Sequence, residues 1–229
     1  INTTTVVKAR MFYAGQLPGP TVTNTYFINE GFDQRGLPVL SLSSDPDYFF
    51  AADSGLYVQD FKPTWEYPVH LEFYEPDGLA GFHHDAGIQV GGQNAWILPQ
   101  KLLNIYSRGQ YGSGHFDYQL FPDNPRTRFG DIVLRCSGND WSYTMFRDGM
   151  MQGLIDQAAD MDDQDFRPCL VYINGQYFGI HNIREKQDAE FTEYYHSIDP
   201  DSLDYIENNA EVKEGNDIAY QQLVAMLTS

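Results

Sequence analysis

The chain has 229 residues, with 14 basic and 32 acidic side chains, so its formal net charge is −18. A charge of this sign repels phosphate backbones and anionic lipids, which excludes nucleic acid and acidic membrane surfaces as expected partners. The sequence contains no apolar run of about 18 residues, so we expect no membrane span. The 16 tyrosines and 15 phenylalanines favour strands over a helical bundle.

The first 29 residues have the pattern of a β-hairpin. Two β-branched runs, Thr4–Phe12 and Thr21–Ile28, flank a turn that is rich in glycine and proline. Two strands alone are only marginally stable, so this hairpin should belong to a larger module or dock on its neighbour. We therefore divide the chain into a module end at 1–29, a linker at 30–37 and a domain at 38–229.

Short strands dominate the first part of that domain, and a capped helical turn is expected at 45–50. Predicted strands lie at residues 37–42, 55–58, 67–74, 86–90, 101–107 and 131–136.

The first long helix is predicted over residues 142–159, with Asp140 or Ser142 as its cap. Apolar residues recur every four positions along it, so we expect Met150, Leu154 and Ile155 to be buried.

Asn174-Gly175 is a strong signal for a two-residue turn between strands 168–173 and 176–183. Helices are predicted at 189–196, capped by Asp188, and at 218–227. This order of strands, helix, hairpin and helices predicts an α+β fold.

Several motifs resemble the CotH-like family, which is named for a spore coat protein. The hairpin Val171–Ile180 is similar to the family's most diagnostic segment, and it continues into Asn182–Lys186 as that family does. Asp140–Asp148 is similar to the pattern before the family's main helix. The resemblance covers about residues 38–229, while residues 1–29 separately resemble the end of a chitobiase C-terminal-type module.

The resemblance implies a divergent kinase that uses ATP and Mg²⁺, with this chain as a kinase-like N-terminal lobe of mostly antiparallel sheet and one main packed helix. Lys101 would then contact the nucleotide phosphates, and Arg108 would add positive charge. Gly91 and Gly92 fall in the segment 87–96 that would cover the phosphates, where glycine lets backbone amides approach an anion.

Three further residues belong to the expected nucleotide site, and two of them, Asp148 and Glu185, have two readings each. Arg147 and Asp148 open the main helix, where Asp148 would either pair with Lys101 or stabilise the helix dipole. Glu185 would either contact adenine or ribose, as a kinase hinge residue does, or form an ion pair with Arg184 or Lys186.

Other residues argue against a complete catalytic site. Ala95-Trp96 stand where the family usually has a Ser-Arg pair, and the family's catalytic and metal-binding aspartates lie further downstream. We therefore expect no catalytic residue in this chain, and weak or no ATP binding.

The acidic run Asp160–Asp165 is expected to be solvated. Neighbours in His83-His84-Asp85 should point to opposite faces of a strand, so we expect no metal site there. We see no Ser-His-Asp pattern in the sequence.

The cysteines follow the same implied sheet, in which strand 176–183 separates Cys136 from Cys169. Two strand spacings are about 9–10 Å, and a disulfide needs Cα atoms within about 7 Å, so we expect free, buried thiols.

Two functional hypotheses follow. The first is an atypical kinase domain of a bacterial secreted or surface protein, acting on basic or Ser-rich surface proteins. The alternative is a non-catalytic extracellular module for adhesion or matrix assembly.

Overall fold

The computed structural model describes residues 1–31, 36–58, 64–92, 97–208 and 210–228. The chain divides into two compact units, Ile1–Arg184 and Glu185–Ser229. Each unit is considered by itself below.

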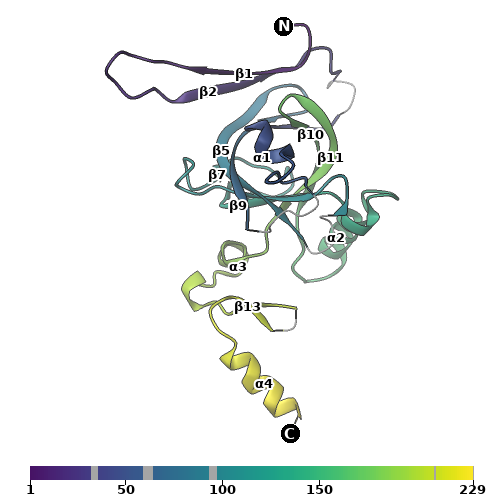
Figure 1. The fold of residues 1–229 in the computed structure, drawn as a ribbon. Helices are drawn as coiled ribbons and strands as arrows, with labels where there is room; N and C mark the ends of the chain where they lie inside the picture. Colours follow the sequence, from purple (N-terminus) through teal and green to yellow (C-terminus); the bar gives the residue numbers. More distant parts are fainter. Residues whose placement is uncertain (32–35, 59–63, 93–96, 209, 229) are drawn as a thin grey trace. The chain divides into compact units, whose positions relative to one another are not determined.

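A closed β-barrel forms the centre of the first unit (Figure 1). Its strands follow one another around the barrel in the order β10-β11-β9-β6-β5-β4-β3. Strands β10 and β3 pair in parallel and close the barrel, whereas the pairs β3-β4, β4-β5, β5-β6, β6-β9 and β10-β11 are antiparallel. The strands are β3 (Val39–Ser43), β4 (Glu66–Tyr74), β5 (Ala80–Gly91), β6 (Leu102–Tyr106), β9 (Asp131–Arg135), β10 (Phe166–Ile173) and β11 (Gln176–Glu185).

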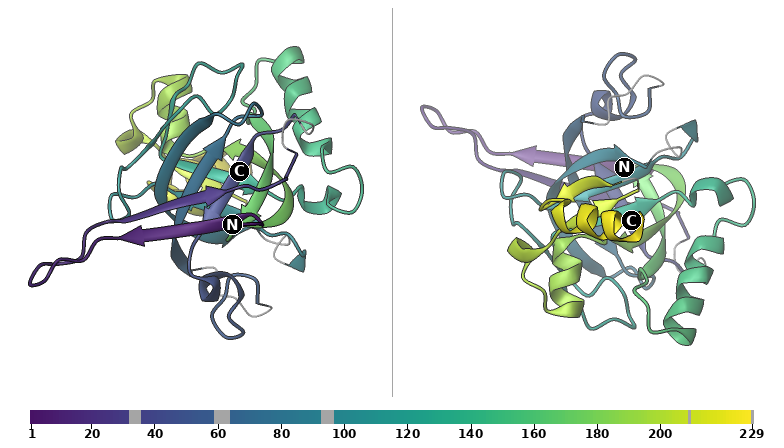
Figure 2. Two further views of the ribbon diagram at one scale, coloured as in Figure 1. Left: turned by 90° about the horizontal axis from the view of Figure 1, so that it is seen from above. Right: turned by 90° about the horizontal axis from the view of Figure 1, so that it is seen from below.

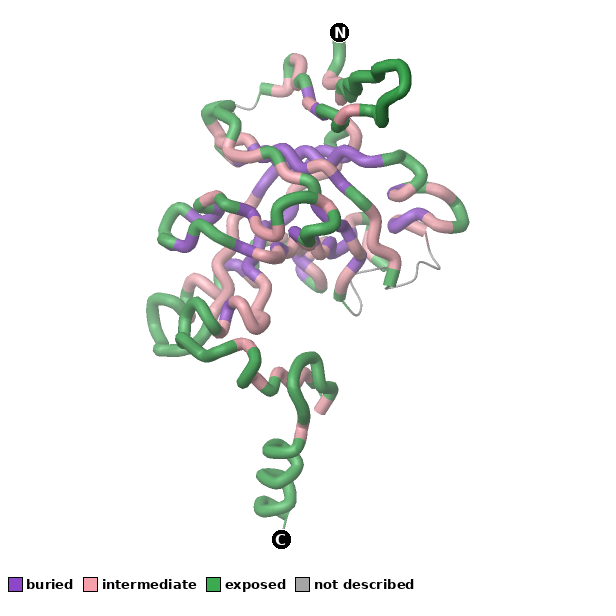
Figure 3. Tube along the Cα trace, turned by 90° about the vertical axis from the view of Figure 1, so that its left-hand side faces the viewer, coloured by how far each residue is buried: buried purple, intermediate pink, exposed green. Residues whose placement is uncertain are grey.

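The barrel interior is filled by alternate side chains of each strand, because successive residues of a strand point to opposite faces. On β4, Val69, Leu71 and Phe73 join the apolar core, whereas His70 and Glu72 lie on the outer face. Figure 3 shows the resulting band of buried residues along the barrel strands. The predicted α+β class with a mostly antiparallel sheet is confirmed.

The N-terminal hairpin, β1 (Thr5–Arg10) and β2 (Thr21–Tyr26), lies across the outside of the barrel (Figure 2). Its threonine face is the docked one: Thr23 and Thr25 are buried, while Val22 on the other face is exposed. The backbone N–H of Thr25 donates to Glu72 at 2.8 Å, and the Thr25 hydroxyl also donates to this carboxylate. The hairpin therefore docks on its neighbour, which was one of the two arrangements expected from the sequence.

The predicted packing of the main helix was wrong. Helix α2 (Arg147–Ala158) begins later than expected, because Met145 has a left-handed φ of 60° that interrupts a helix. Leu154 is 51% exposed and Met150 is 43% exposed, while Ile155 is only partly buried. Gly149 is the buried residue, and its α-carbon packs so close to Phe166 that a Cβ would lie 2.5 Å from the ring. Leu154, five residues further on, is rotated about 140° away from that contact.

Turns and helix caps were predicted more accurately from the sequence than the burial of side chains in α2. Asn174 and Gly175 have φ values of 50° and 80° between β10 and β11, so the predicted two-residue turn is confirmed. Asp45 caps α1 (Pro46–Phe50) as expected. The strand predicted at 55–58 is instead a turn, whose backbone N–H groups at Leu56 and Tyr57 bond to α1 carbonyls.

Cys136 and Cys169 are free and buried, as predicted. Strand β11 lies between β9, which Cys136 follows, and β10, which contains Cys169. Short elements complete the first unit: η3 (Gly138–Asp140), β7 (Phe116–Asp117) and β8 (Arg128–Phe129).

The second unit has small elements. They are α3 (Ala189–His196), η4 (Pro200–Ser202), β12 (Tyr205–Glu207), β13 (Glu211–Glu214) and α4 (Ile218–Thr228). Asp188 caps α3 through the N–H of Phe191, as predicted, and α4 has no buried residue. Within the described ranges, no helix combines the length and apolar character needed to cross a bilayer.

Candidate functional site

The β5–β6 hairpin brings together three residues that the sequence assigned to phosphate binding. Gly91 pairs with Leu102 across the two strands. Gly92 follows this pair on one strand and Lys101 precedes it on the other, so both lie at the same end of the barrel. Ala95 and Trp96, which depart from the family pattern, lie outside the described residues.

The two glycines serve different structural needs. A Cβ on Gly91 would lie 2.5 Å from the Asn104 side chain, so a larger residue there would have to displace the side chains of β6. Gly92 has a φ of 79°, which few other residues adopt without strain. The segment 87–91, expected to be part of a phosphate loop, is strand. Any loop contact with an anion therefore begins at Gly92.

Lys101 points into the barrel. It is 4% exposed, and its amine lies 5.7 Å from the centroid of the Tyr57 ring. Burial lowers the pKa of Lys101, while nearby Cys136 acts in the opposite direction. Burial in turn raises the pKa of the Cys136 thiol. A desolvated amine of this kind attracts an anion more strongly than a surface lysine does.

Two residues near Lys101 were not anticipated from the sequence. The Tyr57 hydroxyl and both ring nitrogens of His181 are buried, and both side chains lie within reach of the Lys101 backbone. Burial lowers the pKa of His181 to about 4, so the ring is neutral at pH 7. The available signal was strand alternation, because His181 shares the inward face of β11 with the core residue Ile183.

Arg108 lies at the opposite end of β6 from Lys101. Its guanidinium forms an ion pair with Glu66 at 3.1 Å and covers the Tyr106 ring at 4.6 Å. The five residues of β6 span about 16 Å. The structure therefore does not bring Arg108 to the Lys101 end of the barrel.

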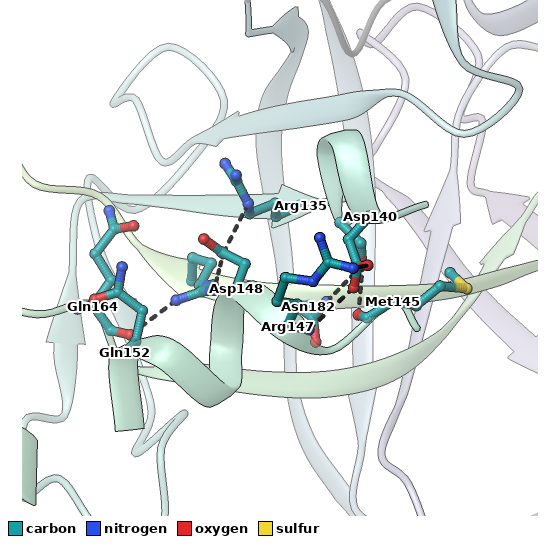
Figure 4. A network of polar contacts seen from close by, with 10 residues as sticks. Arg135, Asp140, Met145, Arg147, Asp148, Gln152, Gln164 and Asn182 are labelled. Atoms are coloured by element: carbon teal, nitrogen blue, oxygen red, sulfur yellow. Dashed lines mark hydrogen bonds and ion pairs between the residues drawn. The ribbon is translucent and has the colours of Figure 1, made fainter. Parts of the chain in front are cut away.

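Asp148 lies on the outer face of the barrel, between two guanidinium groups (Figure 4). It pairs with Arg135 at 2.9 Å and with Arg184, which is 1% exposed. Arg135 alternates with the inward residues Leu134 and Cys136, so the sheet separates Asp148 from Lys101. Asp148 lies in the first turn of α2, and the partners of its carboxylate there are Arg135 and Arg184 rather than the expected Lys101.

Asp140 orders the start of α2. Its carboxylate accepts the backbone N–H of Arg147 at 3.1 Å and lies 3.2 Å from the Arg147 guanidinium (Figure 4). The hydroxyl of Thr144 also donates to it, and this bond is the largest cause that lowers the pKa of Asp140. Asp140 thus accepts an N–H of the helix start from seven residues upstream, whereas the N-cap position itself is Phe146, so the expected capping of this helix by Asp140 or Ser142 was wrong.

Glu185 belongs to the second unit. Within that unit its carboxylate accepts the Tyr195 hydroxyl at 2.9 Å and 3.1 Å. Its expected nucleotide contact stays a prediction. Among the described residues, no three His, Cys, Asp or Glu side chains are grouped so that they could hold a metal ion.

The first unit is thus a mostly antiparallel barrel with a buried lysine beside a glycine turn at one end. A family model described as CotH kinase protein matches residues 88–226, which is more than half of the chain. The chain therefore belongs to the CotH kinase protein family. The match includes Lys101, helix α2 and the β10–β11 hairpin. No curated protein matches the sequence.

Proposed function

We propose that this domain binds ATP, with the phosphates at the Lys101 end of the barrel, as part of an atypical kinase. The observation that carries the proposal is the juxtaposition of Lys101 and Gly92 by the β5–β6 register, in a chain of a kinase family. A cation and a glycine backbone on facing strand ends fit the donor set that phosphates require. ATP would supply the transferable phosphoryl group.

The chain's own groups have separable tasks in this proposal. The protonated Lys101 amine would hold phosphate oxygens, and the anion would offset the effect of burial on the pKa of this amine. The Gly92 backbone would let the phosphates approach closely. Tyr57 and His181 would offer polar atoms beside the lysine. We assign no Mg²⁺ ligand, because no group of three candidate ligands is present in the described parts of the chain.

We also propose that the protein acts outside the cell or at its surface. The family is named for a spore coat protein, and the net charge of −18 suits basic or Ser-rich protein acceptors. Ala95-Trp96, in place of the family's usual Ser-Arg, favours the second candidate function, a non-catalytic surface module on the same scaffold.

Titration calorimetry with ATP and Mg²⁺ tests the nucleotide site. We expect weak binding that falls about tenfold in Lys101→Met, equivalent to about 1.4 kcal/mol. Arg108→Ala is the matched control, since it removes one positive charge at the other end of β6 and should leave affinity unchanged. Absence of binding, or equal losses in both variants, would favour the non-catalytic module.

A further inference from the structure

A cavity lies between the N-terminal hairpin and the outer face of the barrel. Its volume is about 360 Å³, within the usual range for small-molecule sites. Its lining includes Ser43, Tyr48, His70, Asp85, Gln110 and Tyr111. We call this space the hairpin cavity. It is separate from the Lys101 site, because Ser43, His70 and Asp85, which line it, lie on the outer face of the sheet.

Three polar side chains form a row across the floor of this cavity. Ser43 pairs with His70 between β3 and β4, and His70 pairs with Asp85 between β4 and β5. Residues that face each other across antiparallel strands share one face of the sheet, so the three side chains are neighbours. His70 Nδ1 lies 2.6 Å from the Asp85 carboxylate, which accepts a hydrogen bond from Nδ1–H. In a neutral ring, His70 Nε2 is then an acceptor.

Two atoms of this row have unused hydrogen-bonding capacity. The hydroxyl of Ser43, a residue that is 2% exposed, has no hydrogen-bond partner within the described chain, and neither does buried His70 Nε2. Leaving a buried polar atom unpaired costs about 1–3 kcal/mol, so such atoms in a cavity mark a place where a polar ligand would bind.

The row has the residue types of a nucleophilic triad, but its geometry differs. The hydrogen bond between Ser43 and His70 that would activate the hydroxyl is not formed, since neither atom has a partner among the residues that the structure describes. The row therefore supports binding rather than covalent catalysis.

The remaining walls define the kind of ligand. Tyr48 stacks on Tyr67 with ring centroids 4.5 Å apart and an interplanar angle of 3°, which makes a rigid aromatic wall. The Tyr111 hydroxyl is fixed by Glu66 at 3.0 Å. Asp45 and Asp85 repel anions, while the Lys8 amine is engaged with the Ser44 carbonyl at 3.2 Å. Aromatic faces together with mixed donors and acceptors suit the C–H and O–H groups of a sugar.

From these features we infer that the hairpin cavity binds a neutral saccharide, with sugar hydroxyls on Ser43, His70 and Gln110 and a sugar face against Tyr48. The inference goes beyond the proposed nucleotide function and does not depend on it. A kinase-family domain with such a site would be held at a glycan by its outer surface while the Lys101 end of its barrel binds another ligand.

The test uses the full chain with maltose, cellobiose and lactose as probes, each titrated to about 10 mM and followed by calorimetry. We expect at least one disaccharide to bind. Ser43→Ala and Gln110→Ala should each weaken that binding about fivefold or more, because each removes a hydrogen bond to the sugar. Ser54→Ala is the matched control, since its exposed hydroxyl bonds only to Asp53 among the described residues.

Lys101→Met separates the two sites, because it should weaken the response to ATP about tenfold and leave the response to sugar unchanged. Binding of none of the three sugars would overturn the inference and leave the cavity to solvent. Sugar binding that survives both cavity variants would place it elsewhere. A response to inorganic phosphate that is lost in Lys8→Ala would replace the neutral ligand with an anion. Thermal melting of every variant checks that loss of binding is not loss of folding.

Discussion

Asp148 illustrates how a residue's partners decide its role. Its carboxylate lies between Arg135 and the buried Arg184, whose pKa is lowered by burial and raised again by Asp148. We expect Asp148→Ala to lower the free energy of unfolding by about 2–4 kcal/mol, because the buried guanidinium of Arg184 loses its carboxylate partner. This range is lower than for a fully buried pair, since Asp148 is partly exposed to solvent. Urea denaturation measures this loss.

Asp117→Ala is the control for that experiment, since Asp117 is exposed and lies 3.9 Å from Arg128. It should change stability by less than about 1 kcal/mol. The double variant Asp148→Ala/Arg184→Met should recover part of the loss, because it removes the unpaired charge. Equal effects of Asp148→Ala and Asp117→Ala would mean that the buried pair is not a stabilising one.

His181 predicts a pH dependence of stability. Burial lowers its pKa from 6.5 to about 4, so between these values the unfolded chain binds the proton more readily than the folded chain. The free energy of unfolding is therefore not reduced by His181 above pH 6.5. It falls as the pH is lowered below 6.5, and the reduction reaches about 3 kcal/mol at pH 4. Denaturation of the wild type and of His181→Gln across this range should show a shallower slope for the variant. His196→Gln, an exposed site, should keep the wild-type slope.

At the scale of elements, the attachment of the β1–β2 hairpin depends on one buried carboxylate. Glu72 is fully buried and accepts both the N–H and the hydroxyl of Thr25. Thr25→Val keeps the shape but removes one donor, so we expect a loss of about 1–3 kcal/mol. Hydrogen exchange should accelerate in β1 and β2 and stay unchanged in β6. Thr21→Val, at the exposed end of β2, is the control. Unchanged exchange in Thr25→Val would mean that apolar contacts hold the hairpin.

The elements also show which sequence signals were sufficient. The Asn174-Gly175 turn and the Asp45 and Asp188 caps were predicted correctly, because each depends on a few neighbouring residues. Leu154 was placed on the wrong side of α2, because apolar spacing does not reveal that Gly149 makes the closest contact. Periodicity reports a stripe of apolar residues, and the surface that α2 packs on decides which stripe is covered.

At the scale of the whole molecule, the core of the barrel is contained in the first unit. All residues of the main apolar cluster come from positions 40–183, inside Ile1–Arg184. A chain shortened to residues 1–187 should therefore unfold cooperatively, with a melting temperature within a few degrees of the full chain. Calorimetry and near-ultraviolet circular dichroism measure this. Loss of the cooperative transition would show that the second unit is needed to complete the first.

The sequence by itself determined the fold class, the local turns and caps, the free state of the cysteines and the family. These depend on composition, on short motifs or on the order of strands. The tertiary structure decided the rest: that Lys101 and Gly92 share one barrel end, that Arg108 lies at the other, and that Ser43, His70 and Asp85 form a row. Such juxtapositions depend on strand register, and a shift of one residue would turn each side chain to the opposite face of the sheet.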